Sequence, residues 1–368
     1  MEQHLAVALV SIFLTGFPGF LGATLLERIH ERTDRVDCLI QSRYREQAEQ
    51  RAREIVGPNW VETIALHEGD ITEPDLGLAP ETRATLTART RQVFHLAAVY
   101  DLGVDADLAE AVNVDGTEHV LTFATDCPDL DRFQYVSTCY VSGRHDGVFG
   151  PDDLHVDQSF SNHYERTKFH AEQAVQREMV RGLPTTIYRP AIVVGDSQTG
   201  ETEKYDGPYG LLRFLLRQPR VAVLPRFLGA SRHEVNLVPR DFVVDAIAYL
   251  SDQSESVDTV YQLCDPHPPT VSQVTKLFAR ATDRRVIRVP SSSRVVEQAL
   301  RRVPGLQGAT AVDPDTVPYF THPTSYVCPN TRRALADTDI GCPPLASYVE
   351  TLVAYLRANP DVRTDAMV

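Results

Sequence analysis

At 368 residues, with 43% hydrophobic and 23% charged residues, the chain has the length and composition of a globular protein with a large buried core. Its 50 acidic and 36 basic residues give a formal net charge of -14, which repels nucleic acid and anionic lipid, so that a polyanionic ligand needs a local basic patch. No stretch reaches the roughly 20 uninterrupted apolar residues that span a bilayer.

The cysteines and the first residues bear on the compartment. Six cysteines are present without a Cys-x-x-Cys pair or zinc-ligand spacing, so we expect free thiols in a reducing compartment and no metal site. The N-terminus lacks a basic segment and its apolar run continues into a glycine turn, which indicates a buried strand rather than a signal peptide. We expect a cytoplasmic protein, and the sequence leaves open an association with a membrane surface and a homodimer.

The first predicted elements surround a glycine-rich turn. The apolar run over residues 5–14 predicts a strand, and Leu25, Leu26 and Ile29 lie on one face of a predicted helix. Between them, residues 15–22 read Thr-Gly-Phe-Pro-Gly-Phe-Leu-Gly. A strand, a glycine turn and a helix N-terminus together predict a site for a dinucleotide pyrophosphate. The residues expected to contact the cofactor here are Thr15, Gly16, Phe17, Gly19, Phe20, Leu21 and Gly22.

The residues after the second strand bear on the choice of cofactor. Residues 36–40 predict this strand, and a charged helix is expected over residues 44–55. In a dinucleotide fold the end of the strand faces the adenosine ribose, where an acidic residue would select NAD. Here Gln41, Ser42 and Arg43 stand instead. We therefore expect NADP rather than NAD, with Ser42 and Arg43 at the 2′-phosphate.

The next strands end in further candidate cofactor residues. Residues 61–67 and 92–98 predict the third and fourth strands, a helix is expected over 108–124, and residues 132–137 predict a fifth strand. His95 is interpreted as structural, because no second ligand stands at metal spacing. The residues expected to contact the cofactor at these strand ends are Asp70, Ile71, Leu96, Ala97 and Ala98.

The alternation of strands and helices continues to about residue 190. Residues 163–180 predict a helix, residues 185–189 a sixth strand and residues 260–264 a seventh. Such alternation predicts an α/β Rossmann fold, in which a doubly wound parallel sheet of about seven strands is covered on both faces. After the sixth strand, the expected cofactor residues are Pro190, Ile192 and Val193.

The pattern changes beyond Pro190 and suggests a second lobe. Residues 195–210 are polar and loop-like, residues 211–217 form an amphipathic helical pattern, and residues 221–228 are apolar. We expect an NADP-binding domain of residues 1–194 plus about 236–265. The remaining residues, 195–235 plus about 266–368, are expected to form a smaller substrate-binding lobe over the carboxyl ends of the strands.

One segment reverses the acidic balance of the chain. Between residues 204 and 240 the basic residues are Lys204, Arg213, Arg217, Arg220, Arg226, Arg232 and Arg240, against only Asp206 and Glu234. They could receive the phosphates of a polyanionic ligand, with an apolar channel lined by Leu211, Leu212, Phe214, Leu215 and Leu216. An ordinary amphipathic helix or a membrane-surface helix would show the same pattern, and a nucleotide-sugar enzyme would place arginines here for its diphosphate. These alternatives stay open.

The candidate catalytic group combines a tyrosine, a lysine and a threonine. Tyr164 and Lys168 are four residues apart and share one face of the predicted helix. With 14 tyrosines and three lysines in the chain, chance would produce about 0.1 such pairs. The ammonium is expected to lower the pKa of the phenol, and Thr138 stands at the end of the fifth strand beside the expected cofactor. Its neighbour Cys139 is interpreted as a packed small residue.

These motifs resemble the extended short-chain dehydrogenase/reductase superfamily over most of the chain. The superfamily motifs are residues 15–22, Gly69-Asp70, His95 to Ala98, Asn113 to Thr117, Tyr164-x-x-x-Lys168 and Arg189-Pro190. Within the superfamily, the Phe-Leu-Gly ending of the turn, residues 135–138 and residues 188–197 are similar to the thioester-reducing branch. That branch includes fatty acyl-CoA reductases and the terminal reductase domains of carboxylic acid reductases.

The resemblance implies a mechanism. Lys168 would bind the nicotinamide ribose, while Tyr164 and Thr138 would donate hydrogen bonds to a thioester carbonyl as hydride arrives. The branch often carries arginine where Gln41 stands, so phosphate recognition would have to shift to Arg43. We expect neither the long C-terminal domain of animal-type fatty acyl-CoA reductases nor an attached adenylation or carrier domain, which leaves the acyl carrier open.

The sequence therefore favours NADPH-dependent reduction of a fatty acyl thioester, carried by coenzyme A or a carrier protein, to the aldehyde or further to the alcohol. A first alternative is an oxidoreductase, epimerase or dehydratase that acts on a nucleotide sugar, a steroid or another lipid, because the same fold serves all of these. A second alternative is a non-catalytic NADP-binding redox sensor. The intact Thr138, Tyr164 and Lys168 group argues against the sensor.

Overall fold

The computed structural model describes residues 11–227, 230–303, 308, 310 and 312–362. Its central feature is a parallel sheet of seven strands, and the sheet order reverses between β1 and β4. In spatial order the strands are β3 (Ile64–Glu68), β2 (Arg35–Ile40), β1 (Ser11–Thr15), β4 (Gln92–His95), β5 (Arg132–Val136), β7 (Thr185–Pro190) and β11 (Thr259–Leu263). This order confirms the predicted doubly wound Rossmann fold.

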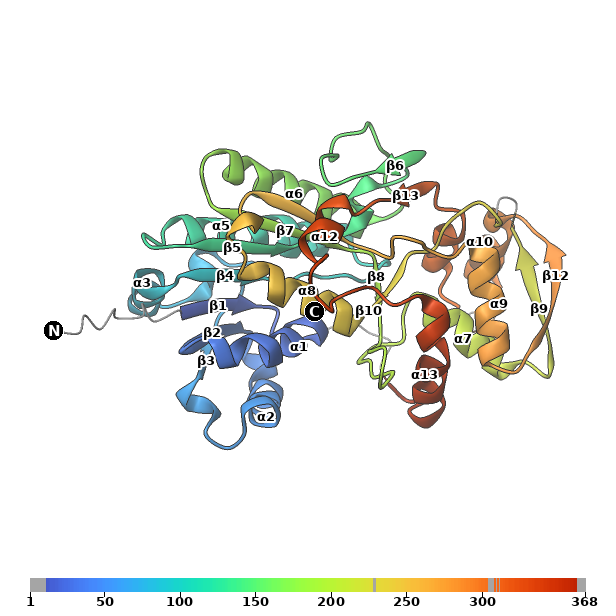
Figure 1. Cartoon of the computed structure of the whole chain (residues 1–368), viewed down its shortest axis with the longest axis horizontal. Coiled ribbons are helices and arrows are strands. Elements are labelled where there is room, and N and C mark those ends of the chain that lie inside the picture. Colours follow the sequence, from blue (N-terminus) through green and yellow to red (C-terminus); the bar gives the residue numbers. More distant parts are fainter. Residues whose placement is uncertain (1–10, 228–229, 304–307, 309, 311, 363–368) are drawn as a thin grey trace.

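Helices cover both faces of the sheet (Figure 1). Ile12 and Leu14 point into one core cluster, whereas Phe13 between them belongs to another, because successive strand side chains alternate. The first cluster packs against α1 (Phe20–Ile29), α2 (Arg45–Val56) and α8 (Arg240–Ser251). The second packs against α3 (Pro80–Arg89), α5 (Gly116–Thr125) and α6 (His163–Val180). Burial of both faces explains why these strands read as nearly continuous apolar runs.

Some predicted boundaries differ from the structure. The third strand begins at Ile64 and not at residue 61, because Trp60–Glu62 forms a 3-10 turn. The fourth strand ends at His95, so Leu96 to Ala98 form a loop. The helix predicted over 108–124 consists of α4 (Ala106–Glu110), a π-helical turn (Ala111–Asp115) and α5. Of the first predicted strand, residues 5–10 lie outside the described residues.

A smaller group of elements covers the carboxyl ends of the strands. Its helices are α7 (Pro208–Arg217), α9 (Val271–Ala281), α10 (Ser293–Arg302) and α13 (Leu345–Ala358), and its strands β9 (Val221–Arg226) and β12 (Arg285–Pro290) pair in parallel. Apolar residues of α7, β9, α9 and α13 form a separate core cluster. We call this group of elements the lobe. It lies at one end of the molecule (Figure 1).

Shorter elements connect the lobe to the sheet. The strands β8 (Ile192–Val194) and β10 (Leu237–Pro239) pair with each other, as do β6 (Gly147–Phe149) and β13 (Thr324–Tyr326). The helix α12 (Pro329–Ala334) contacts β11, so part of the segment assigned to the lobe returns to the sheet. The proposed domain boundaries stay a prediction. One-turn 3-10 helices lie at His30–Arg32, Ser42–Tyr44, Pro74–Gly77, Cys139–Ser142 and Ser254–Ser256, and a longer one at Pro314–Thr321.

No helix in the described part of the chain is long and apolar enough to cross a bilayer.

Candidate active site

The glycine turn predicted from the sequence joins β1 to α1. Gly16 has φ +92°, a left-handed conformation that favours glycine, and a Cβ there would lie 2.8 Å from the Ala97 nitrogen. A Cβ on Gly22 would lie 2.4 Å from the carbonyl oxygen of Gly16. The N-terminus of α1 has no side-chain cap and no acidic residue in its first turn. The backbone N–H groups there and the positive end of the helix dipole fit an anion such as a pyrophosphate.

A cavity of about 1190 Å³ extends from this turn along the carboxyl ends of the strands to the lobe. The predicted residues that line it are Thr15, Gly16, Phe17, Gly19, Phe20, Leu21, Gly22, Asp70, Ile71, Leu96, Ala97, Ala98, Thr138, Tyr164, Lys168, Pro190, Ile192 and Val193. Ser42 and Arg43 are not part of this lining, and Ser42 Oγ donates a hydrogen bond to Glu68 Oε2 at 2.9 Å. The cavity therefore joins the glycine turn and the Thr138, Tyr164 and Lys168 group in one space.

Two arginines flank the end of the cavity near β2. Arg43 Nε donates to Gln41 Oε1 at 2.9 Å, and Gln41 Nε2 donates to Asp70 Oδ2 at 2.7 Å. Arg51, which the sequence interpretation missed, lines the cavity and forms an ion pair with Glu203. The sequence did not distinguish Arg51 from the other arginines of the charged helix α2, so it gave no reason to expect Arg51 in the cavity wall.

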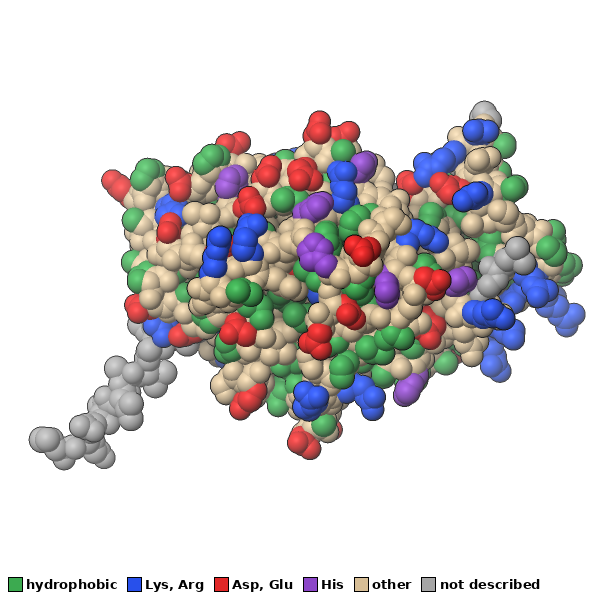
Figure 2. Space-filling model, turned by 90° about the horizontal axis from the view of Figure 1, so that it is seen from above, with side chains coloured by type: hydrophobic (Ala, Val, Ile, Leu, Met, Phe, Trp, Pro, Cys, Tyr) green, Lys and Arg blue, Asp and Glu red, His purple; other side chains and the backbone are tan. Residues whose placement is uncertain are grey.

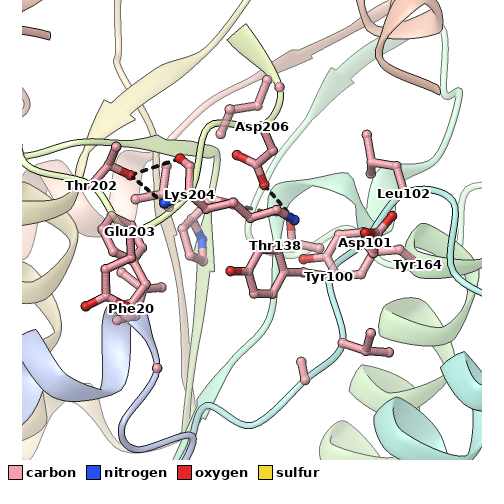
Figure 3. Close-up of a pocket in the computed structure, with 18 of the residues that line it drawn as sticks. Phe20, Tyr100, Asp101, Leu102, Thr138, Tyr164, Thr202, Glu203, Lys204 and Asp206 are labelled. Atoms are coloured by element: carbon pink, nitrogen blue, oxygen red, sulfur yellow. Dashed lines mark hydrogen bonds and ion pairs between the residues drawn. The ribbon is translucent and has the colours of Figure 1, made fainter. Parts of the chain in front are cut away.

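Tyr164 and Thr138 come from different elements and meet in the cavity (Figure 3). Tyr164 lies in the first turn of α6, which begins after Asn162, whose Oδ1 accepts a hydrogen bond from the Glu165 nitrogen at 2.9 Å. Thr138 follows β5, and its hydroxyl donates to the Pro190 carbonyl oxygen at 3.4 Å. Burial raises the pKa of Tyr164 to about 12, and the hydrogen bond with Thr138 opposes this rise. The two hydroxyls are thus close enough to act on one substrate oxygen.

Lys168 lies one turn further along α6, on the same side as Tyr164. Its Nζ donates to the Val136 carbonyl oxygen at 2.8 Å and to the Tyr135 hydroxyl at 2.9 Å. Burial lowers the pKa of Lys168 to about 7. The expectation that the ammonium lowers the pKa of the Tyr164 phenol is wrong for this structure, because desolvation of the phenol raises its pKa to about 12.

His95 is structural, as predicted. Its Nδ1 lies 2.7 Å from Thr15 Oγ1 and its Nε2 lies 3.0 Å from Thr117 Oγ1. Burial lowers the pKa of His95 to about 3, so the ring is neutral near pH 7. Within the described residues, no group of three or more His, Cys, Asp and Glu side chains could hold a metal ion.

The cysteines form no disulfide. All six are free, and five of them are buried. The thiol of Cys139 donates a weak hydrogen bond to the Arg189 carbonyl oxygen at 3.0 Å, which confirms its interpretation as a packed small residue.

Asn113 connects the cavity wall to α6. It lies in the π-helical turn, a feature that often marks functional sites, and its Oδ1 accepts from the Val99 nitrogen at 2.9 Å. Its Nδ2 donates to the Val99 carbonyl oxygen and to Thr167 Oγ1, both at 3.0 Å. Asn113 thereby fixes the loop after β4 relative to the turn of α6 that precedes Lys168. The sequence contained a signal for it only as part of the Asn113 to Thr117 motif.

A second polar group lines the same cavity as Thr138 and Tyr164 (Figure 3). Lys204 Nζ lies 3.2 Å from Asp206 Oδ2 and 4.6 Å from the centre of the Tyr100 ring. Burial raises the pKa of Asp206, and the neighbouring ammonium opposes this rise. The sequence indicated Lys204 through the basic segment and Asp206 as one of the two acidic residues in it, whereas Tyr100 carried no signal.

A fully buried ion pair supports the strand end that carries Thr138. Arg189 Nη2 lies 2.6 Å from Glu172 Oε1, and neither side chain is exposed to solvent. The Ser137 hydroxyl donates to Glu172 Oε2, and Arg189 Nη1 donates to the Gly150 carbonyl oxygen at 3.1 Å. These bonds tie β5, β7 and α6 together directly behind the candidate catalytic group.

The basic segment divides into three groups in the structure. Lys204, Arg213 and Arg217 line the cavity, Arg220, Arg226 and Arg232 are exposed, and Arg240 is buried beside Glu201. The cavity is apolar at the lobe, where its lining includes Leu211, Val235, Leu237, Val274, Phe278 and Phe320. Of the five predicted channel residues, only Leu211 lines the cavity, whereas Leu212 and Leu215 are buried in the lobe core.

The sheet order and the glycine turn between β1 and α1 are those of the extended short-chain dehydrogenase/reductase type. A family model described as male sterility protein, which represents an NAD-binding domain, matches residues 14–247. The chain belongs to this family of NAD(P)-dependent oxidoreductases.

Curated relatives match a part of their own length. A glycine betaine reductase of Emericella nidulans is 28% identical over 281 residues, which are 72% of this chain and 22% of that protein. A fatty acyl-CoA reductase of Drosophila melanogaster is 26% identical over 277 residues, which are 64% of this chain and 53% of that protein. The chain thus spans about a fifth of the first relative and about half of the second.

Solved structures share the fold over nearly the whole chain. The terminal R domain from the myxalamid PKS-NRPS biosynthetic pathway superposes with a TM-score of 0.83 at 26% identity and covers 98% of this chain and 94% of its own. The R domain of a nonribosomal peptide synthetase from Mycobacterium tuberculosis has a TM-score of 0.71 at 21% identity, with 96% and 92% covered, and shows the fold alone. Together with the family match, these similarities confirm the predicted thioester-reducing branch.

Proposed function

We propose that this protein uses NADPH to reduce a fatty acyl thioester to the aldehyde. The observation that carries the proposal is that one continuous cavity connects the glycine turn and the Thr138, Tyr164 and Lys168 group to an apolar end in the lobe. A polar reacting end and an apolar arm are what an acyl thioester requires. The curated fatty acyl-CoA reductase relative supports the same substrate class.

The chain's residues fit a dinucleotide. The close approach of Gly16 to Ala97 leaves no room for a side chain in the turn, and the uncapped N-terminus of α1 fits the pyrophosphate. Lys168 lies at the far end of the same wall, where its ammonium could donate to the nicotinamide ribose hydroxyls. When bound, NADPH supplies a hydride to the substrate's carbonyl carbon.

The two hydroxyls act on the substrate oxygen. Thr138 and Tyr164 donate hydrogen bonds to the thioester carbonyl and so stabilise the negative charge that develops on it. Tyr164 then transfers its proton to that oxygen and leaves a neutral hemithioacetal. Because the phenol has a pKa of about 12 in the free protein, it is fully protonated near pH 7 and ready to donate.

The thioester is cleaved when the hemithioacetal collapses. The carbon–sulfur bond breaks, the thiol leaves with a proton, and the aldehyde carbonyl forms again, so that one hydride and one proton are consumed per thiol released. Arg213 and Arg217, which line the cavity on α7, are suited to the phosphates of coenzyme A or of a carrier-protein arm.

The proposal is tested with a panel of acyl thioesters of different chain lengths, each with NADPH and with NADH. Nucleotide oxidation and free thiol are followed together. One NADPH oxidised per thiol indicates the aldehyde, and two indicate the alcohol. Absence of thiol release from every thioester would overturn the proposal. NAD that remains bound through purification and an isomerised nucleotide sugar would then support the epimerase alternative.

The cofactor preference leads to a prediction about Arg43. Arg43→Ala is expected to raise KM for NADPH about tenfold, because a charge-assisted hydrogen bond to the 2′-phosphate is lost, and to leave KM for NADH unchanged. Steady-state kinetics with both nucleotides measure the effect. Arg51→Ala is the matched comparison. A selective loss in that variant instead would assign phosphate recognition to α2.

The lowered pKa of Lys168 predicts that NADPH binding depends on pH. In the free protein the Lys168 ammonium loses its proton as the pH rises through about 7. NADPH binds to the protonated form, so above this pH its binding must be accompanied by protonation of Lys168. The Kd of NADPH is expected to rise about tenfold between pH 7 and pH 8.5, measured by nucleotide fluorescence. The Lys168→Met variant is expected to bind NADPH weakly at every pH. If its Kd for NADPH rose with pH as in wild type, Lys168 would not be the group that titrates.

A further inference from the structure

The paired strands β9 and β12 present an apolar outer face at the end of the lobe. Val221 and Val223 on β9 are 47% and 52% exposed, and Ile287 and Val289 on β12 are 55% and 46% exposed. Val223 is the register partner of Ile287, so the four side chains form one continuous stripe. The outer side of a surface sheet is usually polar, and an exposed apolar stripe of this kind indicates a binding surface.

The segments that contain β9 and β12 are rich in arginine. Residues 217–232 and 284–302 together contain ten arginines and one acidic residue, Glu297, in a chain whose net charge is -14. In Figure 2 basic side chains gather over this end of the molecule, whereas acidic side chains are spread over the other end. Arg220, Arg226 and Arg285 are exposed, and none of them forms an ion pair within the described residues. They are therefore available to carboxylates of a partner.

This surface adjoins the lobe end of the cavity. Residues 218–220 connect α7, which carries the cavity-lining Arg213 and Arg217, directly to β9. Arg284 fixes this connection, since its Nε donates to the Gln218 carbonyl oxygen at 2.9 Å and its Nη2 to the Leu216 carbonyl oxygen at 3.2 Å. A partner seated on the stripe would therefore lie close to the lobe end of the cavity.

We propose that the surface formed by Val221, Val223, Ile287, Val289, Arg226 and Arg285 docks an acidic carrier domain that delivers the acyl thioester on its flexible arm. This inference rests on the proposed function and selects the carrier-bound substrate over free coenzyme A. A symmetric contact with a second copy would set arginines against arginines. A bilayer fits less well, because the exposed side chains are Val and Ile rather than the aromatic residues of membrane interfaces.

The test compares one acyl group on two carriers. Wild type and the variant Arg220→Glu/Arg226→Glu/Arg285→Glu are assayed with an acidic acyl carrier protein bearing a dodecanoyl thioester and with dodecanoyl-pantetheine. We expect kcat/KM for the carrier-bound thioester to fall at least about tenfold in the variant, and kcat/KM for the pantetheine thioester to stay within about twofold. Arg177→Glu/Arg181→Glu/Arg333→Glu, on exposed residues elsewhere, carries the same change in net charge. It also breaks the surface ion pairs of Arg177 and Arg181 with Glu118 and Glu178, which contribute little to stability, so this variant should behave as wild type.

Several outcomes would overturn the docking proposal. If kcat/KM fell equally for both thioesters, the substitutions would act on the cavity rather than on docking. If kcat/KM fell for neither thioester, the surface would not dock the carrier. The surface would be assigned to a membrane if wild type co-sedimented with anionic phosphatidylserine vesicles, the variant did not, and kcat/KM for the carrier-bound thioester was the same in both. If wild type reduces neither thioester, the proposed function fails, but the docking proposal can still be tested by direct titration with the acyl carrier protein.

In this titration, binding to wild type that is lost in the variant supports docking. Absence of binding to wild type overturns it.

Discussion

Tyr164→Phe is expected to lower kcat for thioester reduction by about 10³-fold, because the variant loses both the proton donor and a hydrogen bond to the developing oxyanion. The Kd of NADPH should stay unchanged, since Lys168 and the glycine turn remain in place. Single-turnover measurements with saturating NADPH isolate this step from product release. The loss should appear in kcat and in kcat/KM alike, as expected for an interaction that strengthens only in the transition state.

Tyr100→Phe is the matched control. Tyr100 lines the same cavity, and its ring faces the Lys204 ammonium, so the variant keeps that contact and loses only a hydroxyl. We expect less than about a threefold change in kcat from this variant. If Tyr164→Phe kept full activity, the catalytic assignment would be wrong, and an unchanged cellular effect of that variant would favour the redox-sensor alternative.

Glu172→Gln is expected to lower the free energy of unfolding by about 3–5 kcal/mol, because it leaves the buried Arg189 guanidinium without its counter-charge. The hydrogen bond from Ser137 would weaken at the same time, and Ser137 directly precedes Thr138. We therefore expect kcat to fall together with stability. Denaturant unfolding monitored by circular dichroism measures the first effect, and the thioester assay below the transition measures the second.

The double variant Glu172→Gln/Arg189→Met tests the cause. Replacing the buried charge by an apolar side chain removes the unpaired guanidinium, so stability should recover by at least about half of the loss. If the double variant were less stable than Glu172→Gln, packing around Arg189 rather than its charge would explain the loss. A single variant with wild-type stability would contradict the importance of the pair.

Local patterns in the sequence were sufficient to predict the sheet and most of the cavity wall. Alternating strands and helices, with apolar residues on two faces of each strand, leave few arrangements besides a doubly wound sheet. Parallel strands in such a sheet end at one edge, so Gly16, Leu96, Thr138 and Pro190 had to meet once the strands were assigned. Tyr164 and Lys168 needed only the helical repeat to share a face.

Other properties depended on contacts between distant segments. The predicted direction of the Tyr164 pKa was wrong because burial of the phenol raises its pKa, and burial is a property of the packed cavity rather than of helical spacing. Arg51 enters the cavity wall because α2 lies beside the segment that carries Glu203, a pairing between residues far apart in the chain. The contact of the Lys204 ammonium with the Tyr100 ring likewise joins two segments that are far apart in the sequence.

The sequence alone was enough to predict the fold, the cofactor class and the candidate catalytic group. These predictions depend on properties of short segments, namely the periodicity of their side chains and the exposure of a helix N-terminus by a glycine turn. The protonation of that group, the apolar arm of the cavity and the basic, valine-lined surface of the lobe were decided by the tertiary structure. Desolvation and surface exposure depend on which distant residues cover a side chain, and neither spacing nor composition contains that information.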